Sequence, residues 1–456
     1  MSTGPLLGLD LDRTAPLGAQ IERQLRAAVR ARRLERGAEL PSTRTLAADL
    51  GVSRGVVVGA YAQLAAEGYI ALRRGAPPVV AAEGYEADDV AADPDVAVAR
   101  ARFNLRPDLP DLGLFPRAQW AAAGRAALHD AANTDLAYGQ PFGAIRLRSQ
   151  LAPFLARTRG VAATPDRTGV FAGSTQALFV LASLLRRRGV REIAIEDPGH
   201  RWRTRALVAA GLVPVPVPVD DAGLRVDCLG GAAAVVVSPA HQFPSAVVMS
   251  AERRRALVQW AVAGGRLVIE HDYDAHFGYE GAAAGALQGL APEHVAYVGS
   301  ASPLLVPALR LGWAVVPAAL VQPVNDQTFF TGISTSRLTQ FTVAEFIERG
   351  YLDRQVRKAR AAYKRRREAL LCSLARHLPD AAVSGAAVGL YASVSLPPDT
   401  DEEALLAAAR SRGVALDGVG EHTVTSQPPG LVLGFAASPE PTLQHAVRQV
   451  AAARRA

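Results

Sequence analysis

Residues Leu267 to Asp274 read LVIEHDYD, a short apolar run that leads directly into a dense group of polar side chains. Three further apolar runs of this kind lie in the same half of the chain, at Glu192–Ile195, Ala233–Val237 and Val295–Val298. Runs of this length, bounded by turn residues, are typical of strands buried on both faces. We therefore expect buried strands at Leu267–Glu270 and at each of these three runs.

Segments with helical periodicity separate these runs, for example Gln176–Arg187 and Ala251–Ala263. Alternation of strands and helices predicts an α/β fold with a mainly parallel sheet and helices on both faces. From about Glu345 the chain is expected to begin a long charged helix and to end in a smaller αβ unit.

The N-terminal residues follow a different pattern, which predicts two short helices joined by a tight turn. Ser42 and Ser53 stand where helix caps are expected, and Gly51 lies between the two helices. The segments Tyr69–Gly75 and Pro78–Ala81 then predict two strands around a turn. Such an arrangement is a helix-turn-helix followed by a wing.

This head resembles the winged helix-turn-helix of GntR-type transcription regulators, on the segments Leu40–Ala47, Gly51–Arg54, Ala60–Tyr69 and Arg73–Gly75. We expect the DNA-binding domain to span residues 1–81. Residues 82–101 are acidic and are interrupted by proline, which predicts a flexible linker. The remainder, residues 102–456, would form the second domain.

Double-stranded DNA is the partner that the head implies. Cationic and hydroxyl side chains at helix N-termini and in a wing can bind phosphates, and arginine can also bind a guanine edge. The candidate DNA-binding residues are Ser42, Arg44, Ser53, Arg54, Arg73 and Arg74. The second helix is poor in polar side chains between Gly55 and Gly59, so we expect binding to depend mainly on phosphates and on salt.

The body resembles the effector domain of MocR-type regulators, a GntR subgroup that carries a fold-type I aminotransferase domain. The matching segments occur in the family order: Leu109–Pro116, Tyr138–Gly143, Gly173–Leu178, Glu196–His200, Pro239–Pro244, Glu270–Asp274 and Leu309–Gly312.

The resemblance implies a pocket for pyridoxal phosphate or a related ligand. Its phosphate end would be formed by Ser174, Thr175, Ser300, Ser302 and Arg310. A capped helix with a buried, carboxylate-paired arginine is the structural alternative for this group. The remaining pocket candidates would face the ring or surround it, and they are His200, His241, His271 and Tyr273.

Three residues depart from the family pattern at the positions that carry the chemistry. Pro303 occupies the place of the lysine that forms the Schiff base, and the chain has only two lysines, Lys358 and Lys364. His271 replaces the aspartate that faces the ring nitrogen, while Asp272 would point to the opposite face of the strand. Val432 replaces the arginine that grips an amino acid carboxylate. We therefore expect no covalent pyridoxal phosphate and no catalytic residue.

The leading hypothesis is a homodimeric, DNA-binding transcription regulator whose body senses another small ligand. One alternative is an enzyme that uses pyridoxamine or pyridoxal phosphate held without a covalent bond, with His271 or His241 as acid or base. Another is a ligand-free dimeric scaffold that only binds DNA. All three hypotheses are compatible with pyridoxal phosphate bound loosely and without a covalent bond.

Composition agrees with a globular protein of several domains. The chain has 456 residues, 49% hydrophobic and 20% charged, with a net charge of +7 that permits a polyanionic partner. The two cysteines, Cys228 and Cys372, suit neither a disulfide framework nor a metal set. Without a signal peptide or a long apolar segment, the sequence predicts a cytoplasmic protein and no membrane partner.

Overall fold

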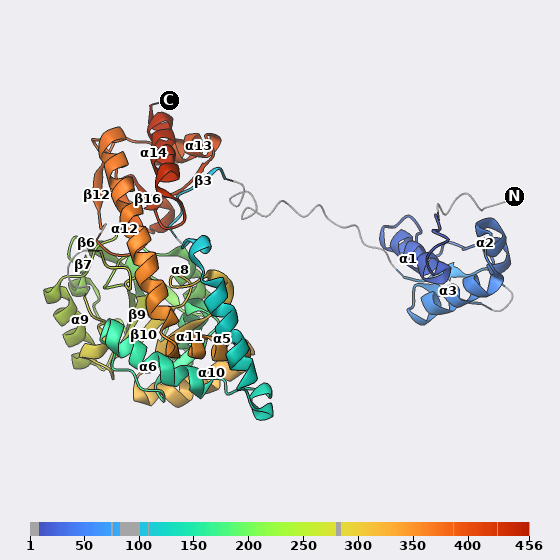
Figure 1. Cartoon of the computed structure of the whole chain (residues 1–456), viewed down its shortest axis with the longest axis horizontal. Helices are drawn as coiled ribbons and strands as arrows, with labels where there is room; N and C mark the ends of the chain where they lie inside the picture. The colour runs from blue at the N-terminus through green and yellow to red at the C-terminus, as the bar shows by residue number, and fades with distance from the viewer. Residues whose placement is uncertain are drawn as a thin grey trace. The chain divides into compact units, whose positions relative to one another are not determined.

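The computed structural model describes residues 9–73, 76–82, 101–107, 109–279, 284–385, 387–425 and 427–455. The chain forms two compact units, Met1–Ala97 and Val98–Ala456 (Figure 1). Arg74, a candidate for DNA contact, lies outside the described residues, as do residues 83–100 of the expected linker.

The N-terminal unit contains three helices, α1 (Leu17–Arg30), α2 (Thr43–Leu50) and α3 (Arg54–Ala66), within its described part. Gly51 ends α2 in the left-handed conformation at φ +60°, as expected for the turn of a helix-turn-helix. Strands β1 (Ile70–Ala71) and β2 (Val79–Val80) pair antiparallel, as the wing prediction requires. Apolar side chains from all three helices form the core: Ile21, Leu25, Leu46, Val57 and Leu64.

The larger unit is built on a sheet of eight described strands in the order β4, β11, β10, β9, β8, β5, β6 and β7. Pairing is parallel from β10 to β6 and antiparallel for β4, β11 and β7 at the two ends. The strand bounds are β4 Thr168–Phe171, β5 Glu192–Asp197, β6 Val213–Asp220, β7 Gly223–Leu224, β8 Ala234–Val237, β9 Leu267–Asp272, β10 Val295–Ser300 and β11 Gly312–Val315. The α/β prediction is confirmed.

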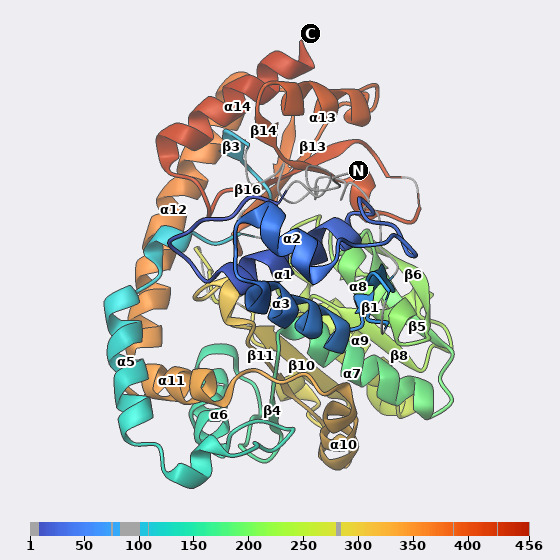
Figure 2. The ribbon, with the colours of Figure 1, turned by 90° about the vertical axis from the view of Figure 1, so that its right-hand side faces the viewer.

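Helices cover both faces of this sheet. Alternate strand residues, such as Ile195 and Ile269, pack against α7 (Ser174–Arg187) and α8 (Arg201–Ala209). Their neighbours turn to the other face, where the cover includes α9 Ala251–Gly264, α6 Ile145–Arg159 and α12 Tyr351–His377 (Figure 2). On β9, His271 therefore shares the α7 and α8 side, and Asp272 points away from it.

The chain ends in a smaller αβ unit, with a four-stranded described sheet in the order β12, β13, β16 and β15. The expected charged helix is α12, which begins at Tyr351 and not near Glu345, because Gly350 at φ +65° separates it from α11 (Arg337–Glu348). The other elements here are β12 Ala382–Ser384, β13 Tyr391–Ser395, α13 Glu402–Ser411, β14 Val414–Ala415, β15 Asp417–Gly418, β16 Gly430–Gly434 and α14 Glu440–Arg454.

Three elements complete the larger unit. They are α5 (Arg117–His129), α10 (Val321–Thr331) and β3 (Phe103–Asn104), which pairs with β14. Of the helices that the structure describes, none has the length and apolarity needed to cross a bilayer.

Candidate functional site

A cavity of about 250 Å³ lies at the carboxyl ends of β9 and β10, beside the start of α7. Ligand sites in parallel sheets typically occupy this edge. The structure brings eight of the nine predicted pocket residues to its wall: Ser174, Thr175, His200, His271, Tyr273, Ser300, Ser302 and Arg310. Sequence reasoning did not select Trp202, Pro307 and Leu390, which also line it.

One end of the cavity is built for an anion. Helix α7 begins after Gly173, which has no side chain to cap it, so the first amides have no partner within the helix. The Arg310 guanidinium lies against Gly173, since a Cβ there would be 3.7 Å from its nearest nitrogen. Arg310 is exposed and pairs with no carboxylate of the described residues, so the alternative of a buried ion pair is not observed. Helix dipole and cation act together here.

The floor of the cavity contains a histidine that is fixed by an arginine. His271 is only 4% exposed, and its Nδ1 lies 2.8 Å from a guanidinium nitrogen of Arg203. Arg203 is itself buried and also donates to the Glu196 carboxylate and the Ser238 hydroxyl. Burial, together with the Arg203 charge, holds the pKa of His271 well below the usual imidazole value. The ring is therefore neutral.

Asp272, the neighbour of His271, faces the other side of the sheet. Its carboxylate pairs with Arg159 at 2.7 Å and accepts a hydrogen bond from the Tyr297 hydroxyl at 3.1 Å. Burial alone would raise the pKa of Asp272, but the Arg159 charge and the hydrogen bonds from Arg159 and Tyr297 keep it below its ordinary value. Asp272 is thus a structural ion-pair partner and does not line the cavity.

His200 closes one side of the cavity in a stack of buried aromatic rings. Its imidazole lies parallel to the ring of Phe243, with centroids 3.6 Å apart, and Tyr391 meets Phe243 edge-on at 5.3 Å. Val432 packs in the same apolar cluster. Burial lowers the pKa of His200 well below its usual value, and the Arg203 charge adds to this effect. The cluster offers no charged group to a ligand carboxylate.

His241 is the one predicted pocket residue that is not part of this wall. Its Nδ1 lies 2.9 Å from the carboxylate of Asp274, and its ring packs on Tyr391. The space beside it is filled by the backbone of Gly389, where a Cβ would collide with the imidazole. This buried pair joins the sheet edge to the C-terminal unit, which the sequence did not reveal because 33 residues separate its members.

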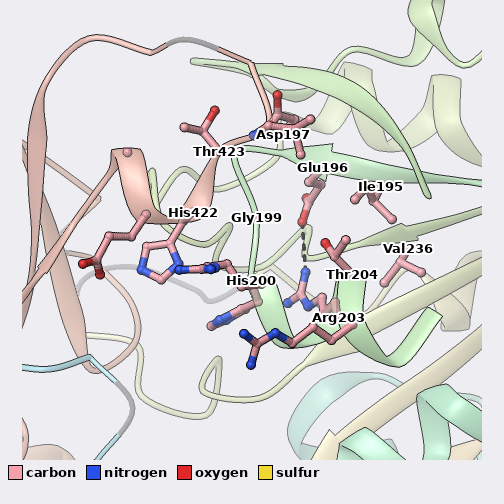
Figure 3. Close-up of a pocket in the computed structure, with 15 residues that line it drawn as sticks. Ile195, Glu196, Asp197, Gly199, His200, Arg203, Thr204, Val236, His422 and Thr423 are labelled. Atoms are coloured by element: carbon pink, nitrogen blue, oxygen red, sulfur yellow. Dashed lines mark hydrogen bonds and ion pairs between the residues drawn. The ribbon is translucent and has the colours of Figure 1, made fainter. Parts of the chain in front are cut away.

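A second cavity, of about 440 Å³, lies on the other side of His200, between the start of α8 and residues 420–424 (Figure 3). The Asp197 carboxylate holds the end of this segment in place, because it accepts hydrogen bonds from the backbone amides of Val424 and Thr425. Sequence reasoning missed Arg203, which lines this second cavity. The available signal is its position three residues after His200 in a helix, which places both side chains on one face.

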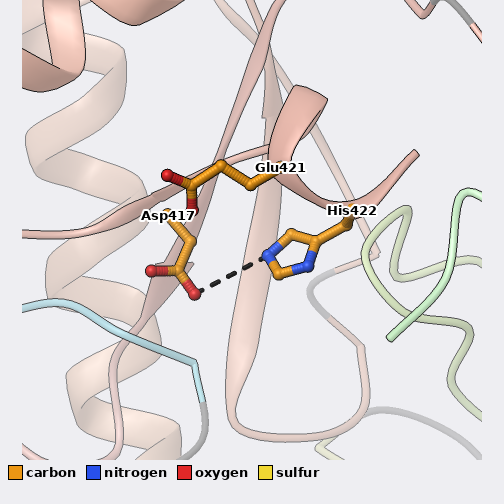
Figure 4. Close-up of side chains that lie close together, drawn as sticks. All are labelled: Asp417, Glu421 and His422. Atoms are coloured by element: carbon orange, nitrogen blue, oxygen red, sulfur yellow. Dashed lines mark ion pairs between the residues drawn. The ribbon is translucent and has the colours of Figure 1, made fainter. Parts of the chain in front are cut away.

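Asp417, Glu421 and His422 form a small cluster near this second cavity (Figure 4). Each carboxylate already has an arginine partner, Arg106 for Asp417 at 3.0 Å and Arg410 for Glu421 at 3.2 Å. Two guanidinium groups at this distance disfavour a cation, so the cluster is better explained as a network of ion pairs.

In the head, those predicted DNA-facing residues that the structure describes are all exposed. Ser42 caps α2 by accepting a hydrogen bond from the amide of Thr45 at 3.1 Å. Ser53 stands at the N-cap of α3 but makes no side-chain cap bond. Arg54 donates to the Thr43 hydroxyl at 3.3 Å, which links the two helices. Arg44 and Arg73 are exposed.

Two family models match the chain. Residues 17–80 match the gntR family of bacterial regulatory proteins, and residues 109–450 match aminotransferase class I and II. Among solved structures, an archaeal alanine:glyoxylate aminotransferase has 25% identity and a TM-score of 0.72, over 77% of this chain and 90% of its own.

Several curated proteins are similar over both units. A probable rhizopine catabolism regulatory protein, MocR of Rhizobium meliloti, is 29% identical over 98% of this chain and 96% of its own. The pyridoxine biosynthesis transcriptional regulator PdxR of Corynebacterium glutamicum is 29% identical, over 94% of each chain. The transcriptional regulator TauR of Rhodobacter capsulatus is 31% identical over 84% of this chain and 85% of its own. The chain therefore belongs to the MocR- and PdxR-type regulators, in which a gntR helix-turn-helix domain is fused to an aminotransferase class I and II domain.

Proposed function

We propose that this protein is a DNA-binding transcription regulator whose aminotransferase-like body works without covalently bound pyridoxal phosphate. The observation that carries the proposal is the joining of a helix-turn-helix head to a cavity that lacks a primary amine. Both lysines of the chain are exposed on α12 and do not line that cavity, and Pro303 does. The nitrogen of a proline within the chain is a tertiary amide without an N–H, and it cannot form a Schiff base.

The head binds double-stranded DNA through the exposed edge of α2 and α3. Arg44 and Arg54 supply cations beside two helix N-termini, where backbone amides favour phosphate. The outer face of α3 presents Gly55, Val58 and Gly59, which offer no hydrogen-bonding side chain to base edges. Binding therefore depends strongly on phosphate contacts and weakens with salt.

Pyridoxal phosphate fits only half of the cavity. Arg310 and the start of α7 suit its phosphate, as they suit any small dianion. The ring end does not suit it, because the neutral His271 replaces an acid that would hold a protonated ring nitrogen. An amino acid carboxylate also lacks a cation, since Val432 packs among apolar side chains. The protein is accordingly a sensor of another small anion, and not an enzyme.

Homodimerisation through the larger unit is part of the proposal. Large apolar side chains stand exposed around α10 and the neighbouring ends of α6 and α11, which lie at the lower end of the view in Figure 2. They are Leu136, Tyr138, Ile145, Phe329, Phe330, Ile333 and Leu338, named here the α10 face. A monomer seldom exposes so many large apolar groups near one another. A second copy of this chain is the occupant that pairs the two heads for DNA.

The experiment is a binding titration of the purified full chain against DNA fragments from its own genomic neighbourhood. It uses two salt concentrations and an excess of non-specific DNA. Tight binding of one fragment that survives the competitor establishes a regulator. Equal binding of all fragments, lost at the higher salt, would indicate a scaffold that does not read sequence.

A further inference from the structure

We infer that the cavity recognises a neutral hydrogen-bond acceptor on its ligand through the Nε2–H of His271. The ligand class is therefore a small anion that carries an unprotonated ring nitrogen or a carbonyl oxygen at the end opposite its charge. This inference rests on the effector pocket proposed above and names what that pocket selects.

Arg203 can only donate in its contact with His271, because a guanidinium has donors and no acceptor. Its nitrogen lies 2.8 Å from Nδ1 of His271, so Nδ1 must present a lone pair. In a neutral imidazole the proton then resides on Nε2. The Arg203 contact thus fixes the tautomer of His271.

Arg203 cannot easily release this contact. It is 4% exposed, and two further acceptors hold its guanidinium, the Glu196 carboxylate at 3.2 Å and the Ser238 hydroxyl at 2.6 Å. The Glu196 carboxylate is in turn fixed by the Ser238 amide at 3.0 Å. Protonating His271 on Nδ1 would place a second donor against the guanidinium, which burial and like charge both oppose.

The Nε2 of His271 has no hydrogen-bond partner among the described residues, although it is buried. Arg203 lies behind the ring and does not line the cavity, whereas His271 does. The unpartnered donor therefore belongs to the cavity side. A buried donor without an acceptor is costly, so a ligand that supplies the acceptor gains affinity.

The cavity presents a hydrogen-bond donor, the Nε2–H of His271, at the place where a protonated pyridine nitrogen would need an acceptor. A ring N–H pointed at Nε2–H would set two donors against each other. Among the described residues, no aspartate or glutamate lines the cavity to accept from such a ring N–H. At the other end, Arg310 and the start of α7 bind the negative charge.

Three small phosphates test the inference on the full chain at neutral pH, by calorimetric titration. Pyridin-3-ylmethyl phosphate offers a ring-nitrogen acceptor, and benzyl phosphate has no acceptor in its ring. The third compound is the N-methylated form of the pyridine, in which a cation replaces the acceptor. We expect the pyridine to bind about tenfold more tightly than benzyl phosphate, as one buried hydrogen bond provides. The methylpyridinium should bind most weakly. Equal affinity for all three, or a preference for the cation, would overturn the inference.

Variants give a second and independent reading. In His271→Phe the pyridine and benzyl phosphates should bind alike, and in His271→Asp the order should shift toward the methylpyridinium. A preference for pyridine that persists in His271→Phe would refute the assignment to Nε2.

Titration with inorganic phosphate distinguishes failure of this inference from failure of the proposed effector pocket. If it binds and the ring nitrogen makes no difference, only the inference fails. If neither it nor any of the three phosphates binds, the effector pocket fails as well, while DNA binding is measured separately.

Discussion

At the scale of single residues, Pro303, His271 and Val432 are the three positions on which the proposed loss of covalent cofactor chemistry depends. Pro303 is buried at the cavity wall, and Val432 is fully buried in an apolar cluster with Phe243, Ala246 and Tyr391. His271 is held by a buried arginine that also neutralises Glu196. Pro303 and Val432 are buried, and the Nδ1 of His271 is hydrogen-bonded to Arg203, so these contacts within the protein place all three residues without a cofactor.

Arginines of the head should contribute to DNA affinity as single phosphate contacts. Arg54→Ala is expected to weaken binding to every DNA fragment and to lower the slope of log affinity against log salt by about 1. Arg376→Ala, an exposed change on α12 that removes the same charge, is the matched control and should leave the slope unaltered. An equal loss in both variants would show that only net charge matters.

His276 should make the protein less stable in acid. Burial lowers its pKa to about 4, although Asp272 opposes this; Arg159 and Arg360 add to the lowering, and the ring stacks on Phe154 beside Thr158. A lowered folded-state pKa favours the neutral form, so stability is complete above the unfolded value of 6.5 and is lost as the pH falls toward 4. The loss amounts to at most about 3 kcal/mol.

The measurement is urea unfolding between pH 7 and pH 4 for the protein and for His276→Phe. As the pH falls, the unfolding free energy of the protein should decrease more than that of His276→Phe. His129→Phe, at an exposed position, is the control and should show no such trend. A difference that stays constant with pH would contradict the assignment.

At the scale of elements, much of the fold could be predicted, because buried strands and capped helices have local signals. Strand β8 was expected from Ala233 and begins at Ala234, and α9 begins at Ala251 as expected. The ends of the strands were harder to predict, because β5 and β9 continue beyond their apolar runs into polar residues that still pair with neighbouring strands. Partners distant in sequence could not be predicted, such as Asp274 for His241 or Phe243 for His200.

Helix caps in the head provide a test at this scale. Ser42 and Ser53 occupy equivalent positions, but only Ser42 accepts a backbone hydrogen bond. Ser42→Ala should therefore destabilise α2 by about 1 kcal/mol, whereas Ser53→Ala should affect α3 much less. Hydrogen exchange of the α2 and α3 amides in the full chain measures both effects. Equal acceleration in the two variants would show that capping is not the cause.

At the scale of the whole molecule, the proposed function assigns DNA binding to the head and ligand binding to the larger unit. The head has its own small core, and the larger unit has a sheet with helices on both faces. Allosteric control requires that the ligand and DNA each bind the two states of the protein with different affinities; preference for the same state strengthens DNA binding, and preference for opposite states weakens it. In a dimer formed through the α10 face, the two larger units would be joined, so that ligand binding in them could affect both heads.

Dimerisation can be tested on the α10 face directly. Phe330 is 71% exposed, so Phe330→Asp should leave the fold intact and shift the protein from dimer to monomer in analytical ultracentrifugation. Leu290→Asp is the control, because Leu290 is 60% exposed outside the α10 face. A Phe330→Asp protein that remains dimeric would place the interface elsewhere.

The most direct test of the central claim is DNA binding measured with and without pyridoxal phosphate. The full chain, freed of any cofactor, is titrated with its specific fragment, then again after incubation with pyridoxal phosphate and reduction by borohydride. The account predicts the same tight, fragment-specific binding in both titrations, with no reduced adduct in the body by mass spectrometry. Specific binding that appears only after the cofactor is added and trapped on the protein would contradict it.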